Sequence, residues 1–369
     1  MSTVTRHQAS SGTVLYSPNR AGFAQLHPSI EPYDAGWLDV GEGHRVYWEA
    51  SGNPQGEAAL LVHGGPGGAI WPRDRRFFDP RRYRIIAFDQ RACGRSTPSG
   101  ELRANTTAHL INDMERLRIR LGVERWLLFG GSWGATLALA YAQAYPKRVS
   151  RLVLRGVFLA RSGELRWLYQ GGAAHMHPQA WREFLRPLPD TQRNDVLAAY
   201  AAALAEPRSD AALALAHAWC AWEDALMTGA SPATIPKALV HAGIDTAGSE
   251  TGSAEGMEYA HDGNDTGDGN ASRHSAGQEV WTAARIGAHY LAHGAFLPEG
   301  ALLAGAARLG GVPGAVVQGR YDLVTPLATA WALHKAWPGS VLRVVEGAGH
   351  ASDEPGITRA LLESVDASA

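Results

Sequence analysis

Gly130-Gly131-Ser132-Trp133-Gly134 is the stretch that decides the fold. An apolar run typical of a buried strand, Trp126 to Phe129, precedes it, and a run of strong helix formers, Ala135 to Ala142, follows it. A serine between glycines on a strand-to-helix turn is the pattern of a nucleophile elbow, whose sharp turn lifts the serine hydroxyl above the edge of the sheet. The first amides of the helix then point to the place where an oxyanion would form. This context disfavours a glycine-rich turn that holds a serine by chance, and it predicts Ser132 as a nucleophile.

The composition is that of a large globular protein without a strongly charged surface. The chain has 369 residues, of which 45% are hydrophobic and 19% charged, enough for a substantial core and roughly two domains. A net charge of −2 favours neither nucleic acid nor a membrane surface as a partner. Cys93 and Cys220 lack the spacing of metal ligands, so we expect reduced thiols. Because no run resembles a signal peptide or a membrane span, we expect a cytoplasmic protein.

Strands alternate with helices in two blocks of the chain, which predicts an α/β fold with a mostly parallel, twisted sheet and helices on both faces. The first block opens with a hairpin from Trp37 to Glu49. The expected strands are residues 58–62, 84–88, 126–129, 149–154, 314–318 and 341–345, and the expected helices are residues 105–121, 135–142, 327–337 and the segment after Pro355. The chain therefore divides into a leader, residues 1–31, and an α/β core made of residues 32–158 and 305–369.

Residues 159–304, between the two blocks, contain no convincing strand and are rich in alanine and tryptophan. We expect them to form a helical cap inserted into the core. Within the cap, residues 245–277 are mostly small and polar, so they predict a polar loop. No metal or other cofactor is expected. His175-Met176-His177 lacks a third ligand, and a calcium-like run in the loop has Arg273 where a bidentate glutamate is needed.

A carboxylate and a histidine follow late strands of the expected sheet. Hydrolases with a nucleophile elbow use the chain order serine, carboxylate, histidine, and these two residues follow Ser132 in that order. Asp322 follows the strand at 314–318, and His350 follows the strand at 341–345. Open α/β sheets build their sites at the carboxyl ends of their strands. His350 would take the proton of Ser132, while Asp322 would orient and stabilise the imidazole. Alone, each residue could be a helix cap or an incidental loop residue, but together they predict a catalytic triad.

A glycine-rich turn after the first buried strand, His63-Gly64-Gly65-Pro66-Gly67-Gly68, predicts the second arm of an oxyanion hole. Glycines let backbone amides approach a carbonyl oxygen closely. We therefore expect the amides of Gly65 and Trp133 to be the donors, with Gly64 beside the substrate. A phosphate-binding loop is the alternative, but the Lys-Ser/Thr ending of that motif is absent.

Six segments together resemble the proline iminopeptidases. These are prolyl aminopeptidases of the α/β-hydrolase fold, serine exopeptidases that release N-terminal proline. The segments are His63–Gly68, Asp89–Ser96, Gly130–Leu139, Leu154–Phe158, Gly319–Asp322 and Gly349-His350. The likeness runs from about Pro32 to the C-terminus, apart from the polar loop. It implies Ser132, Asp322 and His350 as the triad, with Gly65 and Trp133 as oxyanion donors.

The resemblance also implies a set of substrate-binding residues in and near the cap. Glu223, in the pair Trp222-Glu223, would hold the free amine of the substrate, because a carboxylate suits a cationic N-terminus in a partly dry pocket. Phe158 and the stretch from Trp167 to Tyr169 would offer flat surfaces to the pyrrolidine ring, and Arg155 would lie beside the site. The implied partner is a small peptide or amide with an N-terminal proline.

One departure from the family pattern bears on specificity. Where the family usually reads Ala-Arg-Ile-Glu-Asn-His-Tyr, this chain has Ala284-Arg285-Ile286-Gly287-Ala288-His289-Tyr290, so Gly287 replaces a second amine-binding glutamate. The first expectation is a serine aminopeptidase of proline iminopeptidase type. The second is a related serine esterase or amidase acting on an uncharged acyl substrate, which Gly287 favours. A non-catalytic small-molecule-binding protein on the same scaffold ranks third, because such proteins have often lost a triad member and none is missing here.

Overall fold

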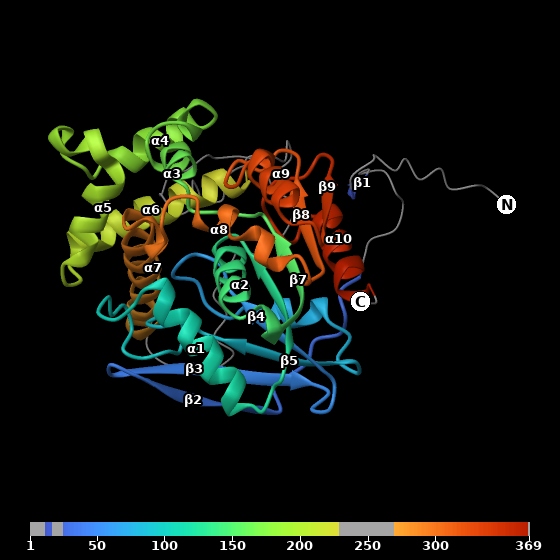
Figure 1. Ribbon diagram of the computed structural model, residues 1–369. Helices are drawn as coiled ribbons and strands as arrows, with labels where there is room; N and C mark the ends of the chain where they lie inside the picture. Colours follow the sequence, from blue (N-terminus) through green and yellow to red (C-terminus); the bar gives the residue numbers. More distant parts are fainter. Residues whose placement is uncertain (1–11, 17–24, 229–268, 368–369) are drawn as a thin grey trace, which may run out of the picture.

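A nine-stranded sheet forms the centre of the computed structural model, which describes residues 12–16, 25–228 and 269–367. The strand order is β1-β9-β8-β7-β6-β4-β5-β3-β2 (Figure 1). The strands are Thr13–Tyr16 (β1), Asp34–Gly41 (β2), His44–Gly52 (β3), Glu57–Val62 (β4), Tyr83–Phe88 (β5), Trp126–Gly131 (β6), Val149–Arg155 (β7), Gly314–Gly319 (β8) and Ser340–Val345 (β9). β3 pairs antiparallel with β2 and β5, and the other neighbours are parallel.

The central strands are buried on both faces, as their continuous apolar sequences predict. On β6, Leu128 belongs to the core on one face of the sheet and Leu127 to the core on the other. Leu128 is aligned with Leu60 on β4 and with Leu152 on β7, both in the same core as Leu128. Because a slip of one residue would exchange the two faces, these two apolar layers fix the register and hence where each strand ends.

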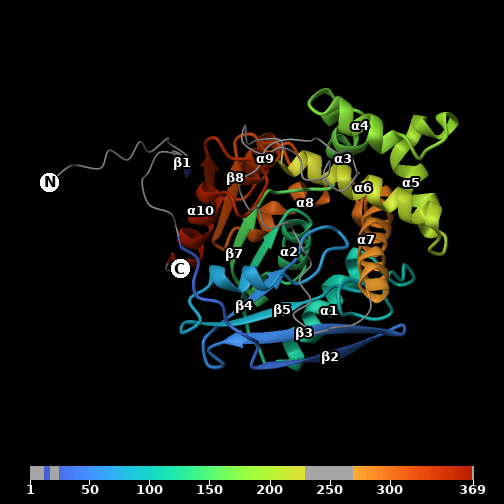
Figure 2. The ribbon, with the colours of Figure 1, turned by 180° about the vertical axis from the view of Figure 1, so that it is seen from behind.

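Helices cover both faces of the sheet (Figure 2). They are Thr107–Arg120 (α1), Trp133–Ala144 (α2), Ser162–Tyr169 (α3), Pro178–Leu185 (α4), Val196–Ala205 (α5), Asp210–Thr228 (α6), Gly269–Ala292 (α7), Ala301–Ala304 (α8), Leu327–Ala336 (α9) and Pro355–Asp366 (α10). α1, α2 and α9 place Leu110, Leu137 and Leu333 in one core, whereas α10 places Ile357 and Leu361 in the other. Within the described residues, no helix has the length and apolar character that crossing a bilayer requires.

Helices α3 to α7 come between β7 and β8 in the chain and gather at one side of the molecule (Figure 1). Their interior is aromatic. Phe184 of α4 stacks on Tyr200 of α5 with 4.5 Å between ring centroids, and on Trp222 of α6 at 5.6 Å. Trp219 of α6 meets Phe184 edge-on at 6.1 Å. Large rings from three helices therefore give the helical insertion expected at 159–304 an apolar interior that is continuous with one core of the sheet.

The elements expected from the sequence are present, with two differences. Thr13–Tyr16 forms β1 and pairs in parallel with β9, although the segment was expected to belong to a loose leader. The open edge of β9 provides the partner, which the local sequence cannot reveal. α7 begins at Gly269, so the polar loop expected to reach residue 277 is helical from 269 onward. A helix gains one hydrogen bond per added residue, so the packed part of α7, which places Trp281 and Ala284 in the core, can extend backward into polar sequence. Residues 245–268 of that loop lie outside the described residues.

The turn around Ser132 tolerates no additional side-chain atoms, which generates a stability prediction. A Cβ on Gly134 would overlap the carbonyl oxygen of Val62, an atom of the adjacent strand that cannot move freely. Gly134→Ala should therefore lower the free energy of unfolding by about 1–3 kcal/mol. Gly311→Ala is the control, because a Cβ there meets nothing within 4 Å and the glycine lacks a positive φ. Urea unfolding measures both, and equal stability of Gly134→Ala and wild type would contradict the prediction.

Candidate active site

Ser132 occupies a sharp turn between β6 and α2, as the sequence predicts. Its φ is 57° and its ψ is −124°, a conformation that a residue with a side chain rarely adopts. The amide of Ser132 donates to the carbonyl of Arg155 on β7 at 2.9 Å, and the Ser132 carbonyl accepts from the amide of Ala135 at 3.0 Å. Hydrogen bonds on both sides hold the strained residue in place, so its side chain projects from the end of the sheet.

Asp322 and His350 form a buried hydrogen-bonded pair. His350 Nδ1 donates to Asp322 Oδ2 at 2.8 Å, and the two side chains are 3% and 1% exposed. Asp322 Oδ1 also accepts from the amide of Thr325 at 2.7 Å, and Oδ2 accepts from Thr325 Oγ1 and Gln318 Nε2 at 2.8 Å each. Burial raises the pKa of Asp322, but His350 and the Thr325 donors outweigh burial and hold this pKa below its ordinary value. Asp322 is therefore a carboxylate near neutral pH.

The same burial acts in the opposite direction on His350. Burial lowers the pKa of His350, and the Asp322 carboxylate opposes this shift without cancelling it. The imidazole is consequently neutral near pH 7. With Nδ1 as the donor to Asp322, Nε2 carries a free lone pair and can accept a proton.

Ser132 and His350 both lie next to the residues at the end of β7. A Cβ on Gly156 would lie 2.7 Å from His350 Cε1, and the preceding residue, Arg155, binds the Ser132 amide. No hydrogen bond joins Ser132 to His350 in the described part of the chain. The structure therefore joins Asp322 to His350 by a hydrogen bond and places Ser132 and His350 at the end of the same strand, without a hydrogen bond between the serine and the histidine. In the absence of substrate such bonds are often long and tighten only on binding.

The glycine turn after β4 lies against the serine turn. A Cβ on Gly64 would be 3.3 Å from the Gly131 carbonyl and 3.8 Å from Ser132 Cβ. Gly65 has a φ of 117°, which favours glycine. Neither the Gly65 amide nor the Trp133 amide has a hydrogen-bond acceptor among the residues that the structure describes. Both predicted donors are thus available to an oxygen from outside the chain.

The contacts of Arg155 and Phe158 that the structure describes are with other parts of the protein. Arg155 Nη1 donates to the His350 carbonyl at 2.5 Å, and its guanidinium covers Gly131, so Arg155 holds the histidine loop against the serine turn. Phe158 is buried, and its carbonyl accepts from Thr136 Oγ1 at 2.8 Å. The contacts described for Arg155 are thus within the protein, and the place beside the substrate that the family resemblance implies for it stays a prediction.

Glu223 of α6 is a half-buried carboxylate held by Tyr169. Tyr169 Oη donates to Glu223 Oε1 at 2.8 Å, and the Tyr169 ring stacks on Trp219 at 4.8 Å. Burial raises the pKa of Glu223 to about 7, although bonds from Tyr169 and Trp219 favour the ionised form. Gly287 of α7 lies next to this group, since its Cβ would be 3.3 Å from both Trp219 Nε1 and the Pro66 carbonyl. Position 287 therefore lies between the glycine turn and the cap carboxylate.

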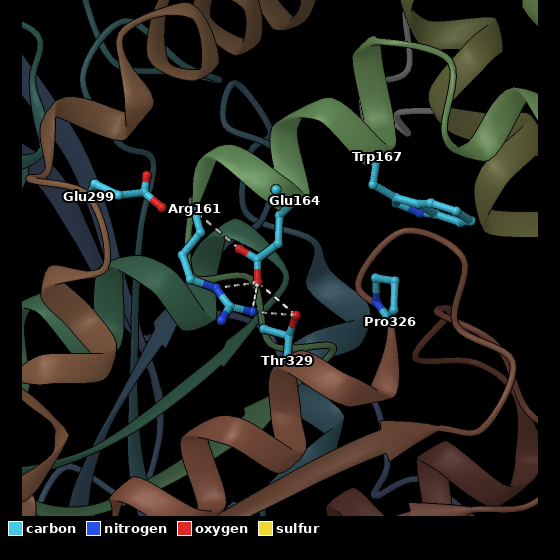
Figure 3. Close-up of a pocket in the computed structure, with 7 residues that line it drawn as sticks. Arg161, Glu164, Trp167, Glu299, Pro326 and Thr329 are labelled. Carbon is cyan, nitrogen blue, oxygen red and sulfur yellow. Dashed lines mark hydrogen bonds and ion pairs between the residues drawn. The ribbon is translucent and has the colours of Figure 1, made fainter.

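A cavity of about 420 Å³ lies between α3 and α9 (Figure 3). It is lined by Arg161, Gly163, Glu164, Trp167, Glu299, Pro326 and Thr329. Glu164 Oε1 accepts from Arg161 Nη2 at 2.9 Å and from Thr329 Oγ1 at 2.6 Å, which joins the cap to α9. Trp167 Nε1 donates to the carbonyl of Leu323 at 2.7 Å. Of the stretch expected to face the substrate ring, Trp167 thus binds the loop that follows Asp322, and Tyr169 contacts Glu223.

Sequence reasoning missed three residues that support Asp322 and His350. Thr325 and Gln318 bind the Asp322 carboxylate, as described above. Glu354 accepts from the Gly349 amide at 2.8 Å and from the Ala351 amide at 3.1 Å, on either side of His350. Thr325, three residues after the aspartate, carries a local turn signal that could have been found. Gln318, four residues before Asp322, and Glu354, three residues after Ala351, are also close in the chain to the groups they bind, but neither belongs to a turn motif that predicts the contact.

Comparison with known proteins agrees with this architecture. The α/β hydrolase fold family matches residues 59–353. A 2-hydroxy-6-oxo-6-phenylhexa-2,4-dienoate hydrolase from Rhodococcus superposes with a TM-score of 0.55 at 19% identity, over 92% of this chain and 100% of that chain. An α/β hydrolase from a deep-sea metagenome library gives 0.56 at 16% identity, over 89% and 96% of the two chains. The protein is thus an α/β hydrolase by fold.

Relatives of higher identity define the family more narrowly. The proline iminopeptidase of Xanthomonas citri is 42% identical over 342 residues, which cover 92% of this chain and 98% of the relative. The proline iminopeptidase of Arabidopsis thaliana is 41% identical over 339 residues, which cover 91% and 80% of the two chains. The chain belongs to the proline iminopeptidase family.

The raised pKa of Glu223 predicts a pH dependence of stability. Between pH 4.5 and about 7 the folded protein keeps a proton that the unfolded chain has released, so this group's contribution to stability falls as pH rises through that window. Glu223→Gln cannot ionise and should become more stable relative to wild type as pH rises from 5 to 8. Urea unfolding at both pH values measures the difference. Tyr169→Phe, which removes a bond to the ionised form, should lose more stability with pH than wild type. A Glu223→Gln difference that is the same at both pH values would contradict the assignment.

Proposed function

We propose that this protein is a serine aminopeptidase of proline iminopeptidase type, which releases N-terminal proline from peptides or small amides through an acyl-enzyme. The observation that carries the proposal is the buried Asp322–His350 pair at 2.8 Å, beside a strained serine at the end of β6. Membership of the proline iminopeptidase family supports the substrate class.

In this reaction Ser132 Oγ attacks the prolyl carbonyl while His350 Nε2 takes its proton. Asp322, bound to Nδ1, stabilises the imidazolium that forms. The amides of Gly65 and Trp133 donate to the oxyanion of the tetrahedral intermediate. The C–N bond then breaks, and the imidazolium gives its proton to the leaving amine. Water attacks the prolyl ester, again with His350 as base, and proline leaves as Ser132 regains its proton.

Recognition of the free N-terminus is assigned to Glu223. A substrate ammonium beside the carboxylate would favour its ionised form, so binding itself would lower the pKa of Glu223 from about 7. Gly64, Phe158 and Tyr169 would bound the space for the pyrrolidine ring. Arg155 would act indirectly by holding the carbonyl of His350.

A second candidate function is that of a related esterase or amidase acting on an uncharged acyl group. Gly287 favours it, because a glutamate at this position would bring a second carboxylate next to Trp219 and the glycine turn. Loss of one charged partner at a desolvated ammonium costs on the order of 2–5 kcal/mol. That range is large enough to weaken selection for a free amine while leaving Ser132, Asp322 and His350 intact.

Removal of the nucleophile tests the chemistry. Ser132→Ala should lower kcat for proline arylamide hydrolysis by about 10⁴-fold or more, because the remaining groups cannot form the acyl-enzyme. Wild type should also be labelled by a fluorophosphonate, and the variant should not be. Circular dichroism and thermal unfolding check that the variant is folded. A folded variant that retains activity would refute Ser132 as the nucleophile.

A three-substrate comparison tests specificity. Proline arylamide should be cleaved much faster than its N-acetylated form or a short p-nitrophenyl ester, and Glu223→Gln should remove roughly 30- to 1,000-fold of kcat/KM for the free amine only. Gly287→Glu should strengthen the preference, with Gly287→Ala as the steric control. Equal or faster cleavage of the acetylated amide or the ester by wild type would favour the esterase or amidase instead.

A further inference from the structure

The two arms of the proposed oxyanion hole come from segments far apart in the chain, and one side chain contacts both. Gln90 follows β5 and is 2% exposed. Its Nε2 donates to the His63 carbonyl at 2.9 Å, at the start of the glycine turn. Its Oε1 accepts from Trp133 Nε1 at 2.8 Å, beside the serine turn. Both ends of one carboxamide are therefore used, one for each arm.

We propose that Gln90 is a positioning residue that fixes the Gly65 and Trp133 amides relative to each other, so that both point at one oxyanion. The inference rests on the proposed function, since it presupposes that these two amides receive a negatively charged oxygen. Gln90 itself would not touch the substrate.

On the first arm, Gln90 acts through the ring of His63. The Gln90 amide donates to His63 Nε2 at 2.9 Å, so the ring proton is on Nδ1, which donates to the Gly64 carbonyl at 2.9 Å. In a planar trans peptide the C=O and N–H point in opposite directions, so holding the Gly64 carbonyl toward His63 aims the Gly65 amide away from it. Burial lowers the pKa of His63 and keeps the ring neutral, as acceptance from Gln90 requires.

On the second arm, Gln90 fixes the residue whose amide is the other donor. Trp133 is fully buried, and Gln90 Oε1 accepts the indole N–H, which can only donate. Tyr290 packs edge-on against the indole with 4.9 Å between centroids, which closes the other side. The chain around Gln90 is fixed in turn, because the neighbouring Asp89 accepts from the Ile70 amide at 2.7 Å.

An apolar residue at 90 would leave two buried polar groups, the His63 carbonyl and the Trp133 N–H, without partners. A carboxylate would accept from Trp133 but repel the His63 carbonyl. Either change lets the two amides move apart. Because the oxyanion exists only in the transition state and the intermediate, the effect should appear in kcat and leave substrate binding unchanged.

The test compares Gln90→Met and Gln90→Glu with Gln143→Met. Gln143 is a matched control, because its Nε2 also donates to a distant carbonyl, Leu302 at 2.7 Å, but away from the site. The measurements are kcat and KM for proline arylamide, inhibition by a prolyl boronate, whose tetrahedral adduct resembles the oxyanion, and inhibition by proline. Each Gln90 variant should lower kcat about 10- to 100-fold, with KM within about 3-fold. Boronate affinity should fall by a similar factor, and proline inhibition and Gln143→Met should match wild type.

Trp133→Phe keeps the Trp133 amide but removes the indole donor. It should lower kcat and boronate affinity as the Gln90 variants do, with KM and proline inhibition unchanged. If the Gln90 variants do not fold, Trp133→Phe tests the proposal in their place. A kcat within 3-fold of wild type in a folded variant overturns the proposal. So does an equal loss of boronate and proline affinity, which would mean a purely structural role. If wild type fails on proline arylamide but reacts with a fluorophosphonate, the proposed function is wrong, and Gln90 is judged by the labelling rate. A wild type inert to both probes overturns both proposals.

Discussion

The backbone of Ser132, with a φ of 57°, is the constraint on which the rest of the site depends. This conformation persists because Gly134 leaves room for the carbonyl of Val62 and because the Ser132 amide is bound by Arg155. The serine turn therefore contacts both β4 and β7. The glycine turn after β4 and the histidine loop after β9, which must approach the hydroxyl, are positioned against these two strands, which flank β6.

The charged groups around His350 are fixed by donors that do not themselves change charge. Thr325 and Gln318 hold the Asp322 carboxylate, and amides on either side of His350 bind Glu354. Asp322, whose donors hold its pKa below the ordinary value, remains ionised in this buried site, so it does not need to reorganise when a neighbouring group gains charge. Such an arrangement suits a reaction in which the imidazole alternates between neutral and charged forms.

The carboxylate of Glu223 in the cap differs from that of Asp322, because its ionised form is less strongly stabilised. Glu223 is held by Tyr169 and Trp219, and burial leaves its pKa near neutrality. Its charge is therefore incompletely stabilised until a cation arrives. On the proposed function, the free N-terminus of the substrate supplies that cation, so recognition and ionisation are coupled. With glycine at 287, that position supplies no second carboxylate, so on the proposed function selection for the free amine would rest on Glu223.

The sequence by itself determined where the functional residues lie along the chain. The elbow at Ser132, the glycine turn, and the places of Asp322 and His350 after late strands all depend on local backbone geometry and hydrophobic periodicity. Tertiary structure alone decided the supporting contacts between remote segments. Gln90 joins two turns, Arg155 holds the histidine loop, and β1 pairs with β9, since each of these contacts links segments remote in the chain. A local pattern specifies the turn that a residue adopts, but its partner across the sheet is set only when both apolar faces have packed.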